Sequence, residues 1–232
     1  MNGFKGFPEQ CLPFLRKLSK NNNRDWFNTH KQDYEALVRE PALQFIQDIA
    51  AGLTEISPHF TAIAKKTGGS LMRVYRDTRF GNDKTPYKTN IGIQFRHELG
   101  KNVHAPGFYV HIATDECFVG VGLWHPESDA LKSIREFIID NPASWKDCMQ
   151  YPPFRKNFQM VGDSLQRPPR GFPADHELIE DLKRKDFIAL KAFDAQKIHD
   201  RKFLRFVLNS FEQADPFMHY LCDAVDVQYR EG

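Results

Sequence analysis

The stretch from Arg73 to Asn90 collects more chemically active side chains than any other part of this sequence. Between Lys65 and Asn90 there are seven basic residues and two acidic ones, so the region carries a net charge of +5 in a chain whose net charge is +2. A local cluster of cations raises the concentration of anions around it. Arginine can also hold a carboxylate or a phosphate through two parallel hydrogen bonds. The pattern therefore predicts a local anion-binding region.

Individual residues can be assigned roles around such an anion. The cations would clamp a phosphate or carboxylate, and aromatic rings would stack on a base or a sugar. These ligand-binding candidates are Arg73, Arg76, Arg79, Lys84, Tyr87, Lys88, Arg96, Trp124 and Arg170. His111 is a candidate general acid or base, because an imidazole with a reference pKa of about 6.5 changes charge near neutral pH. Tyr109 and Tyr75 are the other candidate catalytic residues.

The two acidic residues in the stretch, Asp77 and Asp83, leave a second interpretation open. They could pair with neighbouring arginines, and the stretch would then be a solvated loop or an internal ion-pair network. The surrounding cations should keep both carboxylates ionised. Paired-carboxylate catalysis is therefore not expected.

The local sequence predicts that this stretch is an exposed loop between strands. Phe80-Gly81-Asn82-Asp83 is typical of a turn, because glycine and asparagine tolerate positive φ angles and aspartate can bond to its own backbone. Pro86 favours an extended conformation for Thr85. Loops held by a rigid scaffold often carry binding groups.

Apolar residues alternate with other residues in four runs, which predicts half-buried strands of an antiparallel sheet. The runs cover residues 71–75, 91–96, 108–113 and 118–124. One face would be aliphatic and pack on helices, and the other would be polar and aromatic. The polar face would carry Arg73, Tyr75, Gln94, Arg96, Tyr109, His111, Gly120, Gly122 and Trp124. A shift of one residue in register would exchange the two faces. With the basic loop, the polar face would form a concave cationic site.

The segments before and after these strands have apolar residues at helical spacing. Helices are expected over residues 8–20, 24–38, 41–52, 127–140, 142–149, 175–185, 201–212 and 216–225. Pro152-Pro153 should end the helix that runs through Met149, and 187–193 fits either a fifth strand or the start of a helix. The expected fold is a single α+β domain over residues 1–232. It has a mostly antiparallel sheet of four to six strands, with helices on its apolar face and helical segments at both ends.

Several classes of function find no support in the sequence. It has no apolar run of about 18 residues and no signal-peptide core near Met1, so we expect a cytosolic protein that does not enter a membrane. The four cysteines are scattered, and the histidines lack metal-ligand spacing, so neither a disulfide nor a metal site is expected. No phosphate-binding glycine loop and no nucleophile elbow occur, and no cofactor is indicated.

Several motifs resemble DUF2461, a microbial family of unknown function. They are Asn23-Arg24-Asp25-Trp26-Phe27 with His30-Lys31 and Tyr34, the stretch from Arg73 to Lys88, Gly107-Phe108-Tyr109, Gly120-Val121-Gly122, and Pro169-Arg170-Gly171-Phe172 with His176 and Lys185-Asp186-Phe187. The resemblance covers nearly the whole chain and implies one α+β domain. It implies no activity. One departure is Gln166-Arg167, where we expect a lysine-rich pair.

Three hypotheses of function remain. The first is a site for a small ligand that bears a phosphate or a carboxylate, with or without catalysis. The second is a module for single-stranded nucleic acid, since basic and aromatic residues on an open sheet hold such strands. The net charge of only +2 argues against this second hypothesis. The third is a structural or interaction domain in which the basic stretch is an internal ion-pair network.

Overall fold

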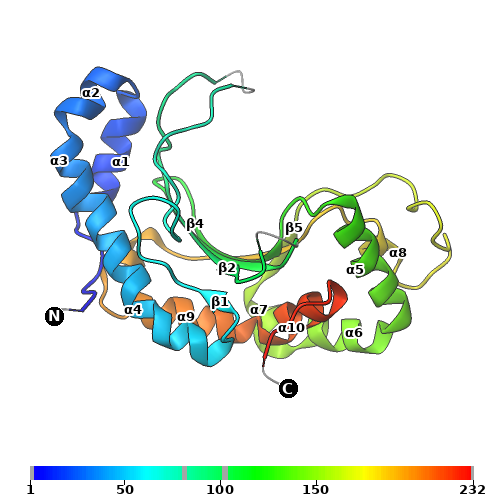
Figure 1. The fold of residues 1–232 in the computed structure, drawn as a ribbon. Coiled ribbons are helices and arrows are strands. Elements are labelled where there is room, and N and C mark those ends of the chain that lie inside the picture. Colours follow the sequence, from blue (N-terminus) through cyan, green and yellow to red (C-terminus); the bar gives the residue numbers. More distant parts are fainter. Residues whose placement is uncertain (1–2, 80–82, 101–103, 231–232) are drawn as a thin grey trace.

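The computed structural model describes residues 3–79, 83–100 and 104–230, and its centre is a curved antiparallel sheet (Figure 1). Six strands lie in the order β1-β2-β3-β4-β6-β5. Their bounds are β1 (Phe60–Thr61), β2 (Ile91–His97), β3 (Gly107–Ile112), β4 (Cys117–Leu123), β5 (Gln159–Val161) and β6 (Phe187–Ala192). The predicted α+β fold with a mostly antiparallel sheet of four to six strands is confirmed. The stretch 187–193, which fitted either a strand or a helix, is strand β6.

The N-terminal helices lie together at one end of the sheet (Figure 1). They are α1 (Cys11–Lys20), α2 (Arg24–Thr29), α3 (Lys31–Tyr34), the π-helical turn η1 (Glu35–Arg39) and α4 (Glu40–Ile56). Asn23 caps α2, since its side chain accepts a hydrogen bond from the Trp26 N–H at 2.9 Å. The helix predicted to open at Pro41 instead continues from η1. Proline donates no backbone hydrogen bond, and the helical hydrogen-bond pattern changes just before it.

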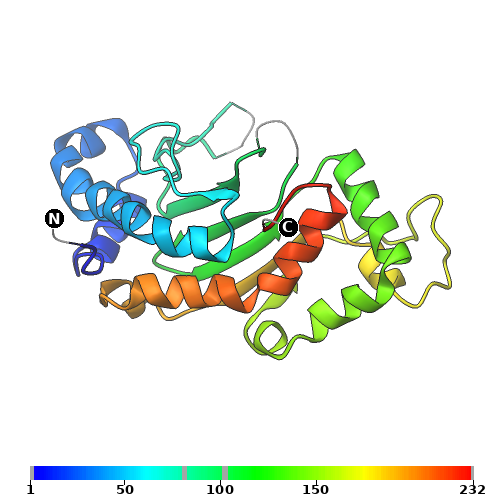
Figure 2. The same ribbon diagram turned by 60° about the horizontal axis from the view of Figure 1, so that its bottom comes forward.

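The remaining helices cover the apolar face of the sheet and its opposite end. They are α5 (Ser128–Asp140), α6 (Pro142–Gln150), α7 (Pro152–Asn157), α8 (Ile179–Leu182), the 3-10 turn η2 (Ala195–His199), α9 (Phe203–Gln213) and α10 (Asp215–Ala224). Figure 2 shows α4, α9 and α10 lying across one face of the strands. Phe108 of β3 joins the two layers, with its ring centre 4.8 Å from that of Phe60 and 4.5 Å from that of Phe211.

No helix of the described residues covers the other face of the sheet (Figure 1), which carries the side chains that the alternation predicted. In register, Gln94 of β2 lies opposite Tyr109 of β3, which lies opposite Gly120 of β4. The next row along the strands contains His111 and Phe118. The intervening residues, such as Val110 and Val119, are buried on the helix side. The predicted assignment of these residues to the two faces of the sheet is therefore correct.

Two further local predictions were wrong. Residues 71–75 form no continuous strand: Leu71 bridges to Ile93 and Tyr75 bridges to Tyr87, because the chain changes partner between them. The helix predicted over 175–185 shrinks to α8. The buried Arg135 donates to the Leu182 and Arg184 carbonyl oxygens at 2.7 and 3.0 Å, and so occupies groups that a longer helix would use.

Helix α6 ends at Gln150, directly before Pro152-Pro153, as predicted; the same prolines also begin helix α7, which was not predicted. Proline fits the first turn of a helix, where its missing N–H would have no partner. The short strands β1 and β5 were not predicted, since two or three residues are too few to show alternation. The predicted turn at Phe80-Gly81-Asn82 lies outside the described residues.

Candidate functional site: a cationic pocket between the basic arm and α2

Residues 73–79 and 83–90, called here the basic arm, fold back as two paired segments and attach to the N-terminal helices. The Lys88 N–H donates to the Val74 carbonyl at 2.7 Å, and the Arg76 N–H donates to the Pro86 carbonyl at 2.9 Å. The Asn22 side chain makes both hydrogen bonds of the Tyr87 peptide groups, donating to the carbonyl at 2.9 Å and accepting from the N–H at 3.1 Å. The Tyr87 ring stacks on Phe27, with centres 4.0 Å apart. The arm is therefore fixed against the start of α2.

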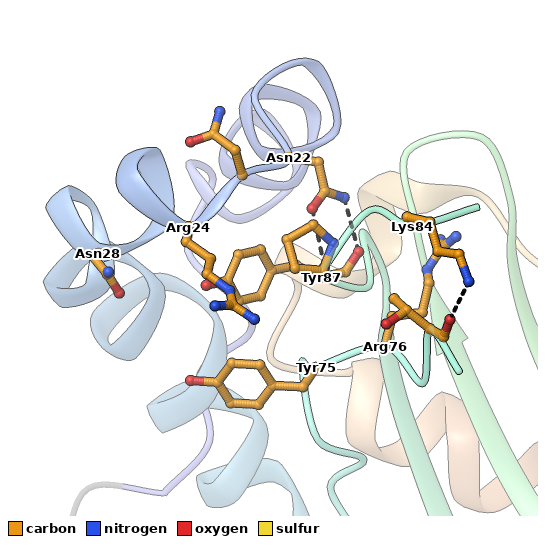
Figure 3. Close-up of a pocket in the computed structure, with 10 residues that line it drawn as sticks. Asn22, Arg24, Asn28, Tyr75, Arg76, Lys84 and Tyr87 are labelled. Atoms are coloured by element: carbon orange, nitrogen blue, oxygen red, sulfur yellow. Dashed lines mark hydrogen bonds between the residues drawn. The ribbon is translucent and has the colours of Figure 1, made fainter. Parts of the chain in front are cut away.

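A pocket of about 620 Å³ lies between the basic arm and α2 (Figure 3). It is lined by Asn22, Asn23, Arg24, Asn28, Tyr75, Arg76, Thr78, Lys84, Pro86 and Tyr87. Figure 3 shows Arg24 reaching from α2 toward the rings of Tyr75 and Tyr87, whose centres lie 5.5 Å apart. The wall thus combines cations, amides and two tyrosine rings.

Both acidic residues of the arm pair with arginines, as the second interpretation predicted. Arg79 holds Asp77 through two bonds, with Nε 3.0 Å from Oδ1 and Nη2 2.8 Å from Oδ2. Arg76 pairs with Asp83, which also accepts the Thr85 N–H at 2.9 Å. These hydrogen bonds lower the pKa of both carboxyl groups, with Thr85 the largest cause at Asp83. Both carboxylates are therefore ionised at neutral pH.

The other cations of this region have no such partner among the described residues. Within residues 3–79, 83–100 and 104–230, no carboxylate lies within ion-pair distance of Arg24, Arg73 or Lys88. Burial lowers the pKa of Lys88, and the nearby charges of Arg73 and Arg76 lower it further. Lys84 donates to the Thr78 carbonyl oxygen at 2.8 Å. Positive charge is thus left uncompensated beside the pocket.

Two of the predicted catalytic residues lie together on the open face of the sheet. The Tyr109 hydroxyl is 3.2 Å from His111 Nδ1, and the His111 ring stacks on Phe118 with centres 4.7 Å apart. Burial raises the pKa of Tyr109 to about 12 and lowers the pKa of His111, although Glu116, 3.8 Å from Nε2, acts in the opposite direction. Both groups are therefore uncharged at neutral pH, and the hydroxyl and Nδ1 share one hydrogen bond. Tyr75, the third candidate, lines the pocket instead.

The remaining binding candidates are spread over the molecule. Arg96 lies on the open face and bonds to Gln94 at 3.1 Å. Trp124 is exposed just beyond the end of β4. Arg170 lines a separate hollow of about 430 Å³ against α5. The structure therefore brings together Tyr75, Arg76, Lys84 and Tyr87 of the predicted site and separates them from Arg170.

Sequence reasoning missed the contribution of α2 to the pocket. Arg24, Asn22 and Asn28 line it, although none was chosen as a site residue. Arg24 stands in the motif Asn23-Arg24-Asp25-Trp26-Phe27, which carried part of the family resemblance. Its two charged residues next to an apolar helix face were the available signal.

Comparison with protein families identifies one match. A family model described as "Conserved hypothetical protein (DUF2461)" covers residues 10–220. The chain belongs to the DUF2461 family. No curated protein and no solved structure matches it.

Among the described residues, no helix combines the length and apolar character that crossing a membrane requires. In the same residues, no group of three or more His, Cys, Asp or Glu side chains is placed to hold a metal ion.

Proposed function

We propose that this DUF2461 protein binds a small anionic ligand, bearing a phosphate or a carboxylate, in the pocket between the basic arm and α2. The observation that carries the proposal is the composition of this pocket, where Arg24, Arg76 and Lys84 stand beside two tyrosine rings. Its volume of about 620 Å³ lies within the range of small-molecule sites. A ligand of nucleotide type would use both parts, with its phosphate on the cations and its ring on the tyrosines.

The charges around the pocket support binding of an anion. Arg73 and Arg76 both repel the Lys88 ammonium group, and Asp77 and Asp83 compensate only part of this charge. An anion bound nearby would reduce that repulsion and would favour the charged form of Lys88. Arg24 contributes a guanidinium on the opposite wall. The binding site would thus be formed by two segments that are distant in sequence.

Binding can be tested by thermal unfolding with inorganic phosphate, AMP, ATP and citrate, each at low and high salt. A ligand at a hundredfold excess over its Kd stabilises the folded state by about 2.7 kcal/mol. For a chain of this size that corresponds to a rise in Tm of roughly 5–10 °C. Arg24→Ala should reduce the rise without unfolding the protein, because Arg24 forms no ion pair within the described residues. Arg205→Ala, on the surface of α9, is the matched control.

A Tm that no anion changes would overturn the proposal. If Arg76→Ala then lowered the Tm of the free protein sharply, the Arg76–Asp83 pair would be part of a structural network.

A second candidate function is the binding of single-stranded nucleic acid, which the open face of the sheet favours. Tyr109, His111 and Phe118 present rings there, and Arg96 lies on the same face. Stacking of bases on such rings does not depend on sequence. A short oligothymidylate would then bind with an affinity that falls steeply with salt, whereas a small ligand in the pocket would show a weaker dependence.

We also propose that the protein is cytosolic. Activity assays on any ligand that binds would test for catalysis. Four cysteines, Cys11, Cys117, Cys148 and Cys222, are buried and unpaired. Free thiols persist in the reducing environment of the cytosol. If the pocket is catalytic, Tyr75 is the predicted catalytic residue that touches it.

A further inference from the structure

A buried carboxylate, Asp186, holds an exposed histidine at the end of β4. Asp186 directly precedes β6 and is 1% exposed. Its Oδ1 accepts the His125 backbone N–H at 2.7 Å and lies 3.0 Å from His125 Nδ1, while its Oδ2 accepts the Asp163 N–H at 3.0 Å. An ionised carboxylate in a buried position requires such partners. Three segments of the chain therefore meet at this one side chain.

Gly162 shows how closely the surrounding backbone approaches Asp186. Its φ angle is +102°, and a Cβ atom there would lie 2.4 Å from the Asp186 Cβ and 2.8 Å from its Oδ2. Only glycine fits a position that combines a left-handed backbone with this contact. The turn after β5 is thus closed over the carboxylate and keeps it from water.

His125 presents the other side of its ring to solvent. Its side chain is 65% exposed, and its backbone has a φ of +50°, a conformation that residues other than glycine seldom adopt. A carboxylate can only accept hydrogen bonds, so its position next to Nδ1 favours a proton on that nitrogen. The neutral ring then carries its lone pair on Nε2, directed away from Asp186. Strained backbone of this kind is often found at functional sites.

Trp124 adds an exposed aromatic surface next to this histidine. The indole is 71% exposed, and its ring centre lies 4.8 Å from that of His125. It follows Leu123, which is paired with Phe187, so Trp124 and Asp186 are the next residues along the two strands. An indole left in water contributes little to folding. Its free face is suited to the C–H groups of a ligand ring, which carry partial positive charge.

A structural role alone explains only part of this arrangement. The two backbone N–H groups that Asp186 accepts would hold the three segments together without any imidazole. The pair His219–Asp223 on α10 provides a contrast, because its side chains are 3.6 Å apart and both are half exposed. There the carboxylate is hydrated and orients the ring weakly. The burial of the carboxylate distinguishes His125–Asp186.

We propose that His125 is a general base, positioned by Asp186, that removes a proton from a hydroxyl group of a sugar ring stacked on Trp124. A sugar meets both requirements of the site, since it offers a C–H face for the indole and hydroxyl groups for the base. In the step, the sugar O–H bond breaks, an N–H bond forms at Nε2, and the electron pair stays on the oxygen. Asp186 compensates the positive charge that the imidazole acquires. The oxygen becomes a nucleophile.

This site is distinct from the anion pocket, with which it shares no lining residue in the described parts of the chain. The role of His125 is therefore independent of anion binding in the pocket.

Acylation by diethyl pyrocarbonate, followed residue by residue with mass spectrometry, tests the proposal on the intact protein at one pH. The reagent attacks an unprotonated imidazole nitrogen, so an exposed, oriented Nε2 should react several-fold faster at His125 than at His219. Asp186→Asn should slow the reaction at His125, whereas Asp223→Asn should leave His219 unchanged. Circular dichroism establishes that each variant is folded. If Asp186→Asn does not fold, the acylation rates of His125 and His219 in the wild-type protein still test the proposal.

The ligand is tested by protection with methyl glucoside and with uridine. Either sugar should slow acylation of His125 in the wild type but not in Trp124→Ala. Protection by both compounds would mean that the sugar ring itself is recognised, and protection by uridine alone would point to a nucleoside. Protection by neither would overturn the sugar assignment. A reaction at His125 no faster than at His219, or unchanged in folded Asp186→Asn, would overturn the general-base role.

Discussion

Asn22→Ala should release the basic arm from α2 while leaving the rest of the fold in place. The side chain makes two hydrogen bonds with the backbone of Tyr87, at 2.9 and 3.1 Å. Each contributes about 1 kcal/mol net, so the arm should lose about 2 kcal/mol of local stability. That corresponds to a roughly 30-fold larger equilibrium constant for opening of the arm. Native-state hydrogen exchange measures it directly, because the amide of Tyr87 is the donor of one of the two bonds.

Two variants serve as controls for this experiment. Asn28→Ala removes a second asparagine from the pocket wall that forms no side-chain hydrogen bond within the described residues, so exchange at Tyr87 should stay unchanged. Asn22→Asp keeps an acceptor for the Tyr87 N–H but turns a carboxylate oxygen toward the Tyr87 carbonyl, and should loosen the arm as well. If Tyr87 exchanged at the wild-type rate in Asn22→Ala, stacking on Phe27 would be what holds the arm.

Two further predictions concern the stability of the fold. Burial lowers the pKa of His111, so the unfolded chain binds a proton more readily. The stability that the neutral ring contributes is present above the unfolded pKa of about 6.5 and is lost as the pH falls from there through the folded value. His111→Gln should therefore flatten the loss of stability between neutral and mildly acidic pH, as measured by urea unfolding. Gly162→Ala should lower Tm far more than Gly171→Ala, because both glycines have positive φ but only the first would press a Cβ against Asp186. Equal losses of Tm in the two variants would show that backbone strain alone matters.

The sheet could be predicted from sequence because its two faces differ in solvent exposure. Val110 and Val119 contact the helix layer and must be apolar, whereas Tyr109 and Gly120 on the other face need not be. The alternation of apolar and polar residues along each strand follows from that difference. In residues 71–75 the same pattern was misleading, since Leu71 and Val74 are both buried but are three residues apart, and Leu71 pairs with Ile93 whereas Val74 bonds to Lys88.

The pocket could be predicted only in part, because its two walls come from distant segments. Charge clustering indicated Arg76 and Lys84, which are close in sequence. Arg24 lies outside this cluster of charges, and the hydrogen bonds that bring it near run from Asn22 to Tyr87, 65 residues away. The same holds for His125 and Asp186, 61 residues apart, where the deciding property is burial of the carboxylate.

The strand directions place the two proposed sites at opposite ends of the sheet. The basic arm leads into Ile91, which lies opposite Ile112 and hence near Cys117 at the start of β4. Trp124 follows the last residue of β4. Seven residues of extended chain span about 20 Å, more than one sugar ring can bridge. Phosphate bound at the pocket should therefore leave the acylation of His125 unchanged, whereas coupling between them would require one extended ligand that lies along the open face of the sheet.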